Sequence, residues 1–256
     1  MLVFGLLALS FAGATVSAAQ PDAQAIKTYL MAHPEVILEA LEKQKVALYD
    51  MVVAGQQIKQ RIAWRENIKR SLANPLKPAI NPERPRLGNP QAPTLVVEYT
   101  NFMCSTCRKG AVALEDLLGK YPIKYQALIK HVPNDDISRQ IALYYEAIAR
   151  QSTGKAYVFY HQVFERQPEL TKNGLLPVLD IVKGLKLDQA RLARDLSDPI
   201  LAQRIKDDTA ESKAFNLGGT PAFIVAGVLL RGPAPVAAFE DIWYLSKGKQ
   251  PPTSNN

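Results

Sequence analysis

The sequence contains very few of the residues that cross-link chains or bind structural metals. Among 256 residues there are two cysteines and three histidines. A small exported domain stapled by disulfides carries cysteines spread along the chain, and a structural zinc site needs about four Cys or His ligands. The histidines lie singly, whereas Cys104 and Cys107 form a Cys-x-x-Cys pair. This spacing is typical of a redox-active pair, so we expect no structural metal and no bound cofactor.

Charge of one sign is not concentrated anywhere in the chain. Lys and Arg number 31 against 24 Asp and Glu, which gives a net charge of +7. The positive excess is spread over the sequence, and no basic segment is interleaved with aromatic residues. Nucleic acid is therefore not an expected partner.

Long apolar runs are absent after the first 19 residues, which carry no ionisable side chain. The run Leu2–Ala14 is followed by small residues that allow signal-peptidase cleavage after Ala18 or Ala19. We interpret residues 1–19 as a signal peptide and expect a periplasmic protein. Because no basic residue precedes the run, an incomplete start and an uncleaved membrane anchor are the alternatives. At the other end, the polar residues 251–256 are expected to form a disordered tail.

The cysteine pair lies at a predicted junction between a strand and a helix. Thr94–Thr100 is rich in β-formers, and Arg108–Lys120 has apolar residues at helical spacing. Cys104 is therefore expected at the helix N-terminus, where backbone N–H groups and the helix dipole stabilise a thiolate. We predict that Cys104 is the nucleophile and that Cys107, one turn later, resolves the mixed disulfide. The uncharged Ser105 and Thr106 are expected to tune the pair through their hydroxyls.

Two segments resemble the DsbA-like branch of the thioredoxin superfamily. The first is V-V-E-Y-T-N-F-M-C-S-T-C, with Glu98 six residues and Phe102 two residues before Cys104. The second, Gly218–Gly227, resembles that family's cis-proline strand. The resemblance implies that Thr220 and Pro221 face the cysteines and bind substrate together with Phe102. It also implies that a buried Glu98 accepts or relays the proton of Cys107.

The resemblance and the periodicity together predict an α/β fold. We expect a thioredoxin-like domain over residues 94–250, with a helical insertion at about 134–215. A second strand is expected at Ile123–Ile129, which would leave His131 in a solvated loop. Arg108 and Lys109 are not assigned to the expected active site. The remaining expected elements are helices at 138–150, 154–165, 175–183, 188–196 and 199–215, a hairpin ending at 231, and a closing helix at 234–247.

Residues 20–73 are expected to form a helical stem. Pro34 suits the first turn of a helix, and no further proline occurs before Pro75. Tyr29–Leu41 resembles the N-terminal segment of ScsC-type proteins, some of which oligomerise through it. We therefore expect a homo-oligomer, dimer or trimer; the alternative is that the helix breaks at Gly55 and folds back on its own domain. A heptad-like seam passes through Ile37, Leu41, Gln44, Leu48, Met51, Gly55, Ile58 and Ile62.

The segment 74–93 contains prolines at 75, 78, 82, 85, 90 and 93. Such a segment cannot be helical and is expected to be extended and semi-rigid. We predict that it is a linker that separates the stem from the catalytic domain.

These features predict an exported thiol–disulfide oxidoreductase. Its expected partners are exported client proteins and a membrane redox partner. Oligomerisation and the lack of a Pro-His dipeptide between the cysteines favour an isomerase or reductase over a strong oxidase. The alternatives are a monomeric DsbA-like oxidase, and a non-enzymatic protein that binds Cu(I) through its two thiolates or acts as a chaperone.

Overall fold

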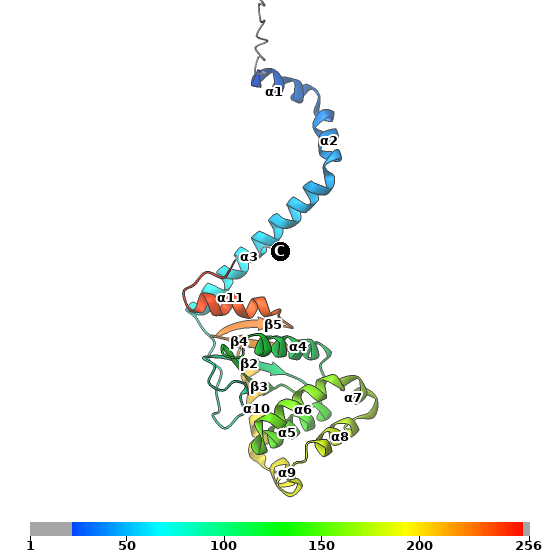
Figure 1. The fold of residues 1–256 in the computed structure, drawn as a ribbon, viewed down its shortest axis with the longest axis vertical. Helices are drawn as coiled ribbons and strands as arrows, with labels where there is room; N and C mark the ends of the chain where they lie inside the picture. The colour runs from blue at the N-terminus through cyan, green and yellow to red at the C-terminus, as the bar shows by residue number, and fades with distance from the viewer. Residues whose placement is uncertain (1–21, 253–256) are drawn as a thin grey trace, which may run out of the picture. The chain divides into compact units, whose positions relative to one another are not determined.

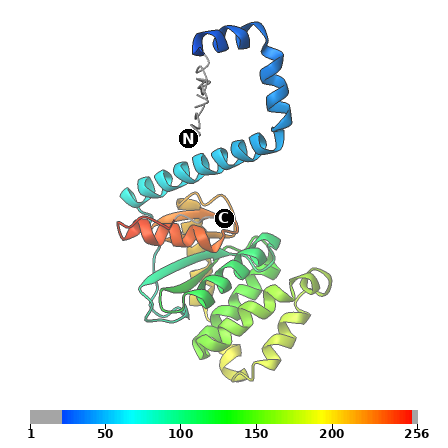
Figure 2. The same ribbon diagram turned by 45° about the horizontal axis from the view of Figure 1, so that its top comes forward.

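The computed structural model describes residues 22–252. The expected signal peptide and the last four residues of the expected tail lie outside this range. The chain divides into two compact units, Met1–Gln60 and Arg61–Asn256. Figure 1 follows the chain through its helices and strands, and Figure 2 shows the same ribbon from another direction.

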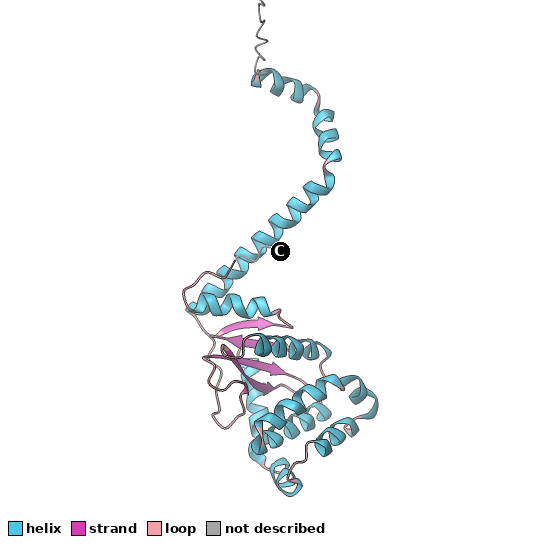
Figure 3. Cartoon of the chain, in the orientation of Figure 1, coloured by secondary structure: helices cyan, strands magenta, loops and turns pink. Residues whose placement is uncertain are grey.

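The second unit is built on a mixed sheet in the order β1-β3-β2-β4-β5. Central strand β2 runs parallel to β3 and antiparallel to β4. The edge strands β1 and β5 are antiparallel to their neighbours. Figure 3 shows this sheet with helices packed around it. The strands are β1 (Leu87–Gly88), β2 (Thr94–Thr100), β3 (Tyr125–His131), β4 (Ala222–Val225) and β5 (Val228–Arg231).

The two faces of the sheet are covered differently. Val96 and Ile129 belong to the large core, which also contains side chains from α4 (Ser105–Lys120) and α11 (Val236–Ser246). Val97 and Tyr99, on the other face, pack in a smaller cluster with Leu217. Because side chains alternate along a strand, Glu98 points to the same face as Val96. A carboxyl group therefore faces the large core.

The expected helical insertion is present between β3 and β4. Its first helix, α5, begins with a capping box between Asp135 and Ser138. The short helix α7 was not expected, because its residues are mostly polar and show no apolar periodicity. The insertion consists of α5 (Asp136–Gln151), α6 (Thr153–Glu165), α7 (Gln167–Asn173), α8 (Leu176–Gly184), α9 (Gln189–Leu196) and α10 (Pro199–Ala214).

The proline-rich segment 74–93 differs from the spacer that we expected. It contains β1, and the side chains of Arg84 and Leu87 are buried. Leu76 donates its backbone N–H to the carbonyl of Gly227 at 2.9 Å. Gly227 is required there, since a Cβ would collide with Pro75 and the backbone has φ +80°. The prolines do prevent a helix, but the extended chain packs on the catalytic domain and belongs to it.

The N-terminal unit contains α1 (Ala23–Ala32), α2 (Pro34–Lys43) and the first part of α3 (Lys45–Ala73). The helical stem breaks at Gln44 and not at Gly55. The Gln44 N–H bonds to the carbonyl of Leu41, a tight i to i−3 closure that ends α2. Glycine inside a helix costs only about 1 kcal/mol, and α3 continues through Gly55.

The last part of α3 belongs to the second unit, Arg61–Asn256. Ile68 is fully buried in the large core, with Trp64 and Leu72 packed against that core. At the far end, Pro251 of the expected tail is also buried. Within residues 22–252, no helix combines the length and hydropathy needed to cross a membrane.

Candidate redox active site

The two cysteines lie where the sequence places them, at the start of α4. Cys104 is the N-cap residue, with φ −85° and ψ 119°, and Cys107 is in the first turn. The turn before the helix is closed by Asn101, whose carbonyl accepts the N–H of Cys104 at 3.0 Å. The side-chain oxygen of Asn101 accepts the N–H of Met103 at 2.8 Å. This short-range turn puts the Cys104 thiol at the positive end of the helix dipole.

The loop before β4 contacts Cys104 directly. The Thr220–Pro221 peptide bond is cis, and the Cys104 Sγ lies 3.4 Å from the carbonyl oxygen of Thr220. Gly110 makes this approach possible, because a Cβ at that position would lie 2.9 Å from Pro221. The structure thus brings together Cys104, Thr220 and Pro221, which are far apart in the sequence.

The environment of Cys104 favours its thiolate. Burial alone would raise the pKa of this thiol, but hydrogen bonds from Thr106 and Cys107 outweigh burial and lower the pKa. The Oγ1 atom of Thr106 lies 2.9 Å from the Cys104 Sγ. Ser105 and Thr106 are both exposed, but of the two only Thr106 has its hydroxyl in contact with this sulfur. Thr106 is therefore the residue between the cysteines that touches the sulfur.

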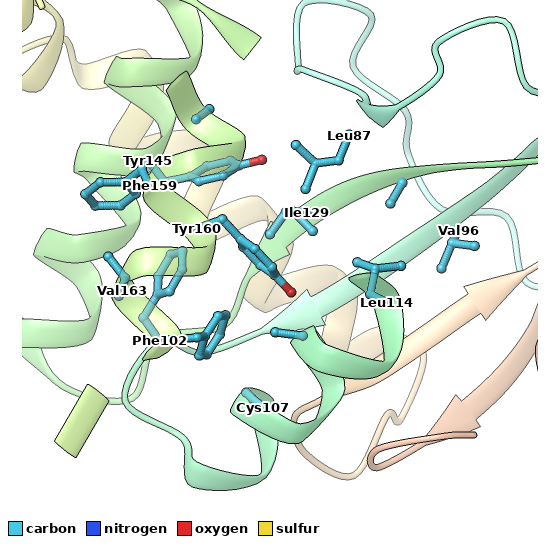
Figure 4. Close-up of a cluster of buried hydrophobic side chains, with 14 of the residues drawn as sticks. Leu87, Val96, Phe102, Cys107, Leu114, Ile129, Tyr145, Phe159, Tyr160 and Val163 are labelled. Carbon is cyan, nitrogen blue, oxygen red and sulfur yellow. The ribbon is translucent and has the colours of Figure 1, made fainter. Parts of the chain in front are cut away.

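Cys107 has the opposite properties. Its side chain is fully buried, and burial raises the pKa of its thiol to about 12. In Figure 4, Cys107 faces the buried cluster that contains Phe102 and Tyr160. The site therefore combines one partly exposed thiol that ionises readily with one buried thiol that needs a proton acceptor before it can react.

Glu98 is a buried acid on the same face of β2. Its side chain is fully buried, and Tyr160 of α6 donates its hydroxyl to Oε2 at 2.6 Å. Burial raises the pKa of Glu98 to about 7, although the hydrogen bond from Tyr160 favours the ionised form. A carboxyl group with this pKa can take up or release a proton near neutral pH. No pattern in the sequence indicates that Tyr160 lies beside it.

Phe102 does not lie where a substrate could contact its ring. The side chain is 1% exposed, so the prediction that it binds substrate fails for the side chain. Phe102 follows Asn101 in the segment between β2 and α4. Its ring packs in the core and anchors this segment. Five aromatic or imidazole rings surround it: His131, Tyr145, Phe159, Tyr160 and Phe164.

The expectation that His131 lies in a solvated loop is wrong. Strand β3 extends to His131, which pairs in register with Thr100. The imidazole is 1% exposed, stacks on Phe102, and lies 3.3 Å from Glu146 of α5. Its burial depends on helices that follow it in the chain, so strand periodicity alone could not reveal it.

Gln167 is a site residue that the sequence analysis missed. This first residue of α7 donates its side-chain Nε2 to the carbonyl of Phe102 at 2.7 Å and to that of Cys104 at 3.0 Å. It also lines a pocket of about 530 Å³ together with Ser105, Arg108, Lys109 and Val112. Arg108 and Lys109 are exposed there. No sequence signal distinguishes this glutamine from other polar residues of the insertion.

A metal site with several ligands is not formed by the described part of the chain. Within residues 22–252, no group of three or more His, Cys, Asp or Glu side chains could hold a metal ion. The two thiols of Cys104 and Cys107 are the soft ligands at this site.

Known proteins share this fold. A crystal structure of a thioredoxin-like oxidoreductase from Silicibacter pomeroyi DSS-3 matches with 25% identity and a TM-score of 0.56, covering 66% of this chain and 94% of that one. Proteus mirabilis ScsC in a transitional conformation matches with 17% identity and a TM-score of 0.57, covering 88% of this chain and 98% of that one.

A relative with a different architecture also matches. The Na(+)/H(+) antiporter NhaA of Herminiimonas arsenicoxydans is 30% identical over 158 residues, which cover 61% of this chain and 25% of the antiporter. The chain thus spans about a quarter of the length of this curated relative.

The model of the thioredoxin family matches residues 81–242. These residues contain the cysteine pair, the helical insertion and the cis-proline loop. The chain therefore belongs to the thioredoxin family, and its fold is that of thioredoxin-like thiol–disulfide oxidoreductases.

Proposed function

We propose that the protein is an exported thiol–disulfide oxidoreductase that uses Cys104 as its nucleophile. The observation that carries the proposal is the unequal pair of thiols at the cis-proline loop. Cys104 is partly exposed, its pKa is lowered by hydrogen bonds against the effect of burial, and it faces the carbonyl of Thr220. Cys107 is buried and stays protonated. Thiol–disulfide exchange needs this division between an attacking and a resolving sulfur.

In the first step, the Cys104 thiolate attacks one sulfur of a client disulfide. The client S–S bond breaks, its second sulfur leaves as a thiolate that takes a proton from water, and a mixed disulfide forms. The client chain lies in an extended conformation against Thr220 and Pro221, next to the Cys104 sulfur. The Thr220 carbonyl, 3.4 Å from that sulfur, is placed to receive a backbone N–H of the client.

In the second step, Cys107 resolves the mixed disulfide. The Cys107 thiol gives its proton to ionised Glu98, and its sulfur attacks the Cys104 sulfur. The first client sulfur leaves as a thiolate, so two electrons have passed to the client and the protein holds a disulfide. A thiol-bearing membrane redox partner then returns the two electrons. In isomerisation, a free thiolate of the client attacks the mixed disulfide instead, Cys104 is released, and no net electrons are transferred.

We assign isomerisation or reduction to the protein because of its N-terminal unit. In Asp22–Gln60 no residue is buried, and exposed apolar residues recur along the helices, among them Ile37, Leu41, Met51 and Ile58. An amphipathic helix with no buried face is stabilised when it packs against another chain. The match to ScsC, which covers 88% of this chain, extends beyond the catalytic unit. A dimer or trimer would hold several active sites around one misoxidised client.

Export is part of the proposal and depends on residues 1–19. Their apolar sequence and the small residues before Gln20 have the pattern of a signal peptide. Disulfide exchange on folding proteins requires an oxidising compartment. The periplasm is such a compartment.

The proposal is tested with single cysteine variants of the mature protein. Cys104→Ser should reduce the rate of disulfide exchange to the uncatalysed level, whereas Cys107→Ser should accumulate mixed disulfides with clients that are released by dithiothreitol. Asp116→Asn, at an exposed residue of the same helix α4, serves as the control and should react at the wild-type rate. Wild-type exchange by Cys104→Ser would disprove the proposal.

The result also separates the alternatives. A protein in which both cysteines are replaced by serine and which still prevents aggregation of an unfolded client would be a chaperone. A wild-type protein that binds Cu(I) tightly but does not exchange disulfides would be a metal-binding protein. A monomer that rapidly oxidises reduced clients and does not reshuffle scrambled ones would be a DsbA-like oxidase.

A further inference from the structure

Gln167 connects the helical insertion to the active-site turn. Its side chain is 7% exposed, and its Nε2 donates to two backbone carbonyls, those of Phe102 and Cys104. A primary amide carries two N–H groups on this nitrogen, so each carbonyl can receive its own hydrogen. Gln167 is the first residue of α7, which is separated from Cys104 by β3 and three helices, α4, α5 and α6, in the chain. The contact is therefore made only by the folded insertion.

The two carbonyls belong to the turn that orients the nucleophile. The Phe102 carbonyl lies between β2 and α4, outside both elements. The Cys104 carbonyl begins the helix, because it accepts the N–H of Cys107 at 3.0 Å and that of Arg108 at 3.4 Å. Hydrogen bonds from Gln167 hold these two peptide units in one orientation. That orientation determines where the Cys104 sulfur lies relative to the helix N-terminus and to Thr106.

The donor also acts electrostatically. The N–H groups of Gln167 are the positive end of the amide dipole, and they are directed at the main chain of Cys104 in a largely buried position. A fixed positive dipole end near a sulfur favours the thiolate over the thiol, as the helix N-terminus does. Stabilising the thiolate of the reduced form makes a cysteine pair a stronger oxidant.

We propose that Gln167 is a positioning residue for Cys104, through which the helical insertion sets the stability of the Cys104 thiolate and the dithiol–disulfide equilibrium of the pair. This inference rests on the proposed function for its biological meaning. It adds no step to the reaction: Gln167 neither touches the client disulfide nor gains or loses a proton. Its effect passes through the Phe102 and Cys104 carbonyls to the position of one sulfur.

The test compares Gln167→Met with wild type. Methionine has a similar length and fills similar space but cannot donate a hydrogen bond. The pKa of Cys104 is measured in the reduced full-length protein from thiolate absorbance as a function of pH; Cys107 stays protonated over that range. We expect the acid dissociation constant of Cys104 to fall about tenfold. The equilibrium with glutathione should shift about tenfold toward the protein disulfide, which corresponds to about 30 mV.

Gln162→Met is the matched control, because Gln162 is an exposed residue of the neighbouring helix α6. It should leave both equilibria unchanged. Thermal unfolding of all variants separates a loss of folding from a change in the thiol. Gln167→Glu provides a second variant: its carboxylate faces the two carbonyl oxygens, and its charge should raise the Cys104 pKa further than methionine does.

A Cys104 pKa and a glutathione equilibrium equal to wild type in a folded Gln167→Met or Gln167→Glu protein would overturn the inference. Failure of the proposed function would look different. In that case the wild-type protein would not exchange disulfides, while the pKa of Cys104 would still report on Gln167.

Discussion

The proton affinity of Glu98 is set by its immediate neighbours. The side chain is fully buried, and burial raises its pKa to about 7, with the Tyr160 hydroxyl 2.6 Å away partly offsetting the effect. Cys107 is buried on the same side of the sheet as Glu98, in the large core. When this carboxyl group moves from water into the core on folding, it must either take up a proton or have its charge stabilised by a small number of hydrogen bonds. Glu98 can therefore accept a proton, but its buried carboxylate lowers the free energy of unfolding.

Replacing Glu98 by glutamine should reveal that cost through its pH dependence. The folded pKa is raised from 4.5 to about 7, so the folded state binds this proton more tightly than the unfolded state does. The contribution of Glu98 to the stability of wild type is fully present below pH 4.5 and is lost as the pH rises through about 7. Glu98→Gln should be more stable than wild type at pH 8, by on the order of 3 kcal/mol, with the difference shrinking toward pH 4.

Urea unfolding at pH 4, 6 and 8 measures the effect of Glu98→Gln. Glu115→Gln is the control, because Glu115 is an exposed residue of α4. A stability difference that does not change with pH would contradict the predicted cost. The same Glu98→Gln protein should resolve mixed disulfides more slowly at neutral pH, since an amide cannot accept the proton of Cys107.

At the scale of elements, a buried ionic network joins the proline-rich segment to the insertion. Arg84, which precedes β1, bonds both carboxylate oxygens of Asp208 on α10, at 2.8 and 2.6 Å. It also pairs with Glu146 on α5 at 2.9 Å. All three side chains are at most 4% exposed. A segment whose regular secondary structure is limited to β1 is thus fixed to two helices by the guanidinium of Arg84, which is bidentate toward Asp208.

Arg84→Met should destabilise the catalytic unit by about 3 to 5 kcal/mol, because the carboxylates of Glu146 and Asp208 would remain buried without their main cation. Chemical denaturation monitored by tryptophan fluorescence measures the loss. Lys77→Met, an exposed lysine of the same segment, is the control and should change stability by less than about 0.5 kcal/mol. Equal stabilities of the two variants would show that the network does not hold the segment in place.

At the scale of the whole molecule, two units of different character belong to one chain. Arg61–Asn256 contains the sheet, the insertion and the redox site. Met1–Gln60 contributes helices whose described residues bury no side chain. A folded unit of this kind gains little from its own packing, since most helical stability in proteins comes from burying an apolar face. The proposed association with another copy of the chain would bury its apolar residues.

The double variant Ile37→Glu and Leu41→Glu places two charges on the apolar positions of α2. We expect its molar mass by light scattering to fall to that of a monomer, and its refolding of a scrambled client to be lost. The Cys104 pKa should not change, because that site lies in the other unit. The control, Glu39→Gln with Lys43→Gln, removes an exposed ion pair of the same helix and should keep the wild-type mass. A wild-type protein that is already monomeric would contradict this assignment.

Features that depend on residues close together in the chain could be predicted from the sequence alone. The strand Thr94–Thr100 and a helix over Arg108–Lys120 follow from residue patterns within one short segment, and they predict Cys104 near a helix N-terminus; the helix of the structure begins three residues earlier, at Ser105. Most helices of the insertion were predictable for the same reason, because apolar residues recur at helical spacing. The location of the Cys-x-x-Cys pair and its chemistry were therefore visible without a fold.

Features that depend on residues far apart in the chain became visible in the folded molecule. Three sets of contacts join residues that are 15 to 65 positions apart in the chain. They are the hydrogen bond from Tyr160 to Glu98, those from Gln167 to the carbonyls of Phe102 and Cys104, and the contact of His131 with Glu146. Phe102 turned inward because aromatic residues of the insertion surround it, and Arg84 was buried because two helices supply its carboxylates. Local periodicity carries no information on such pairings, because burial and hydrogen bonding depend on which surfaces meet once the chain has folded.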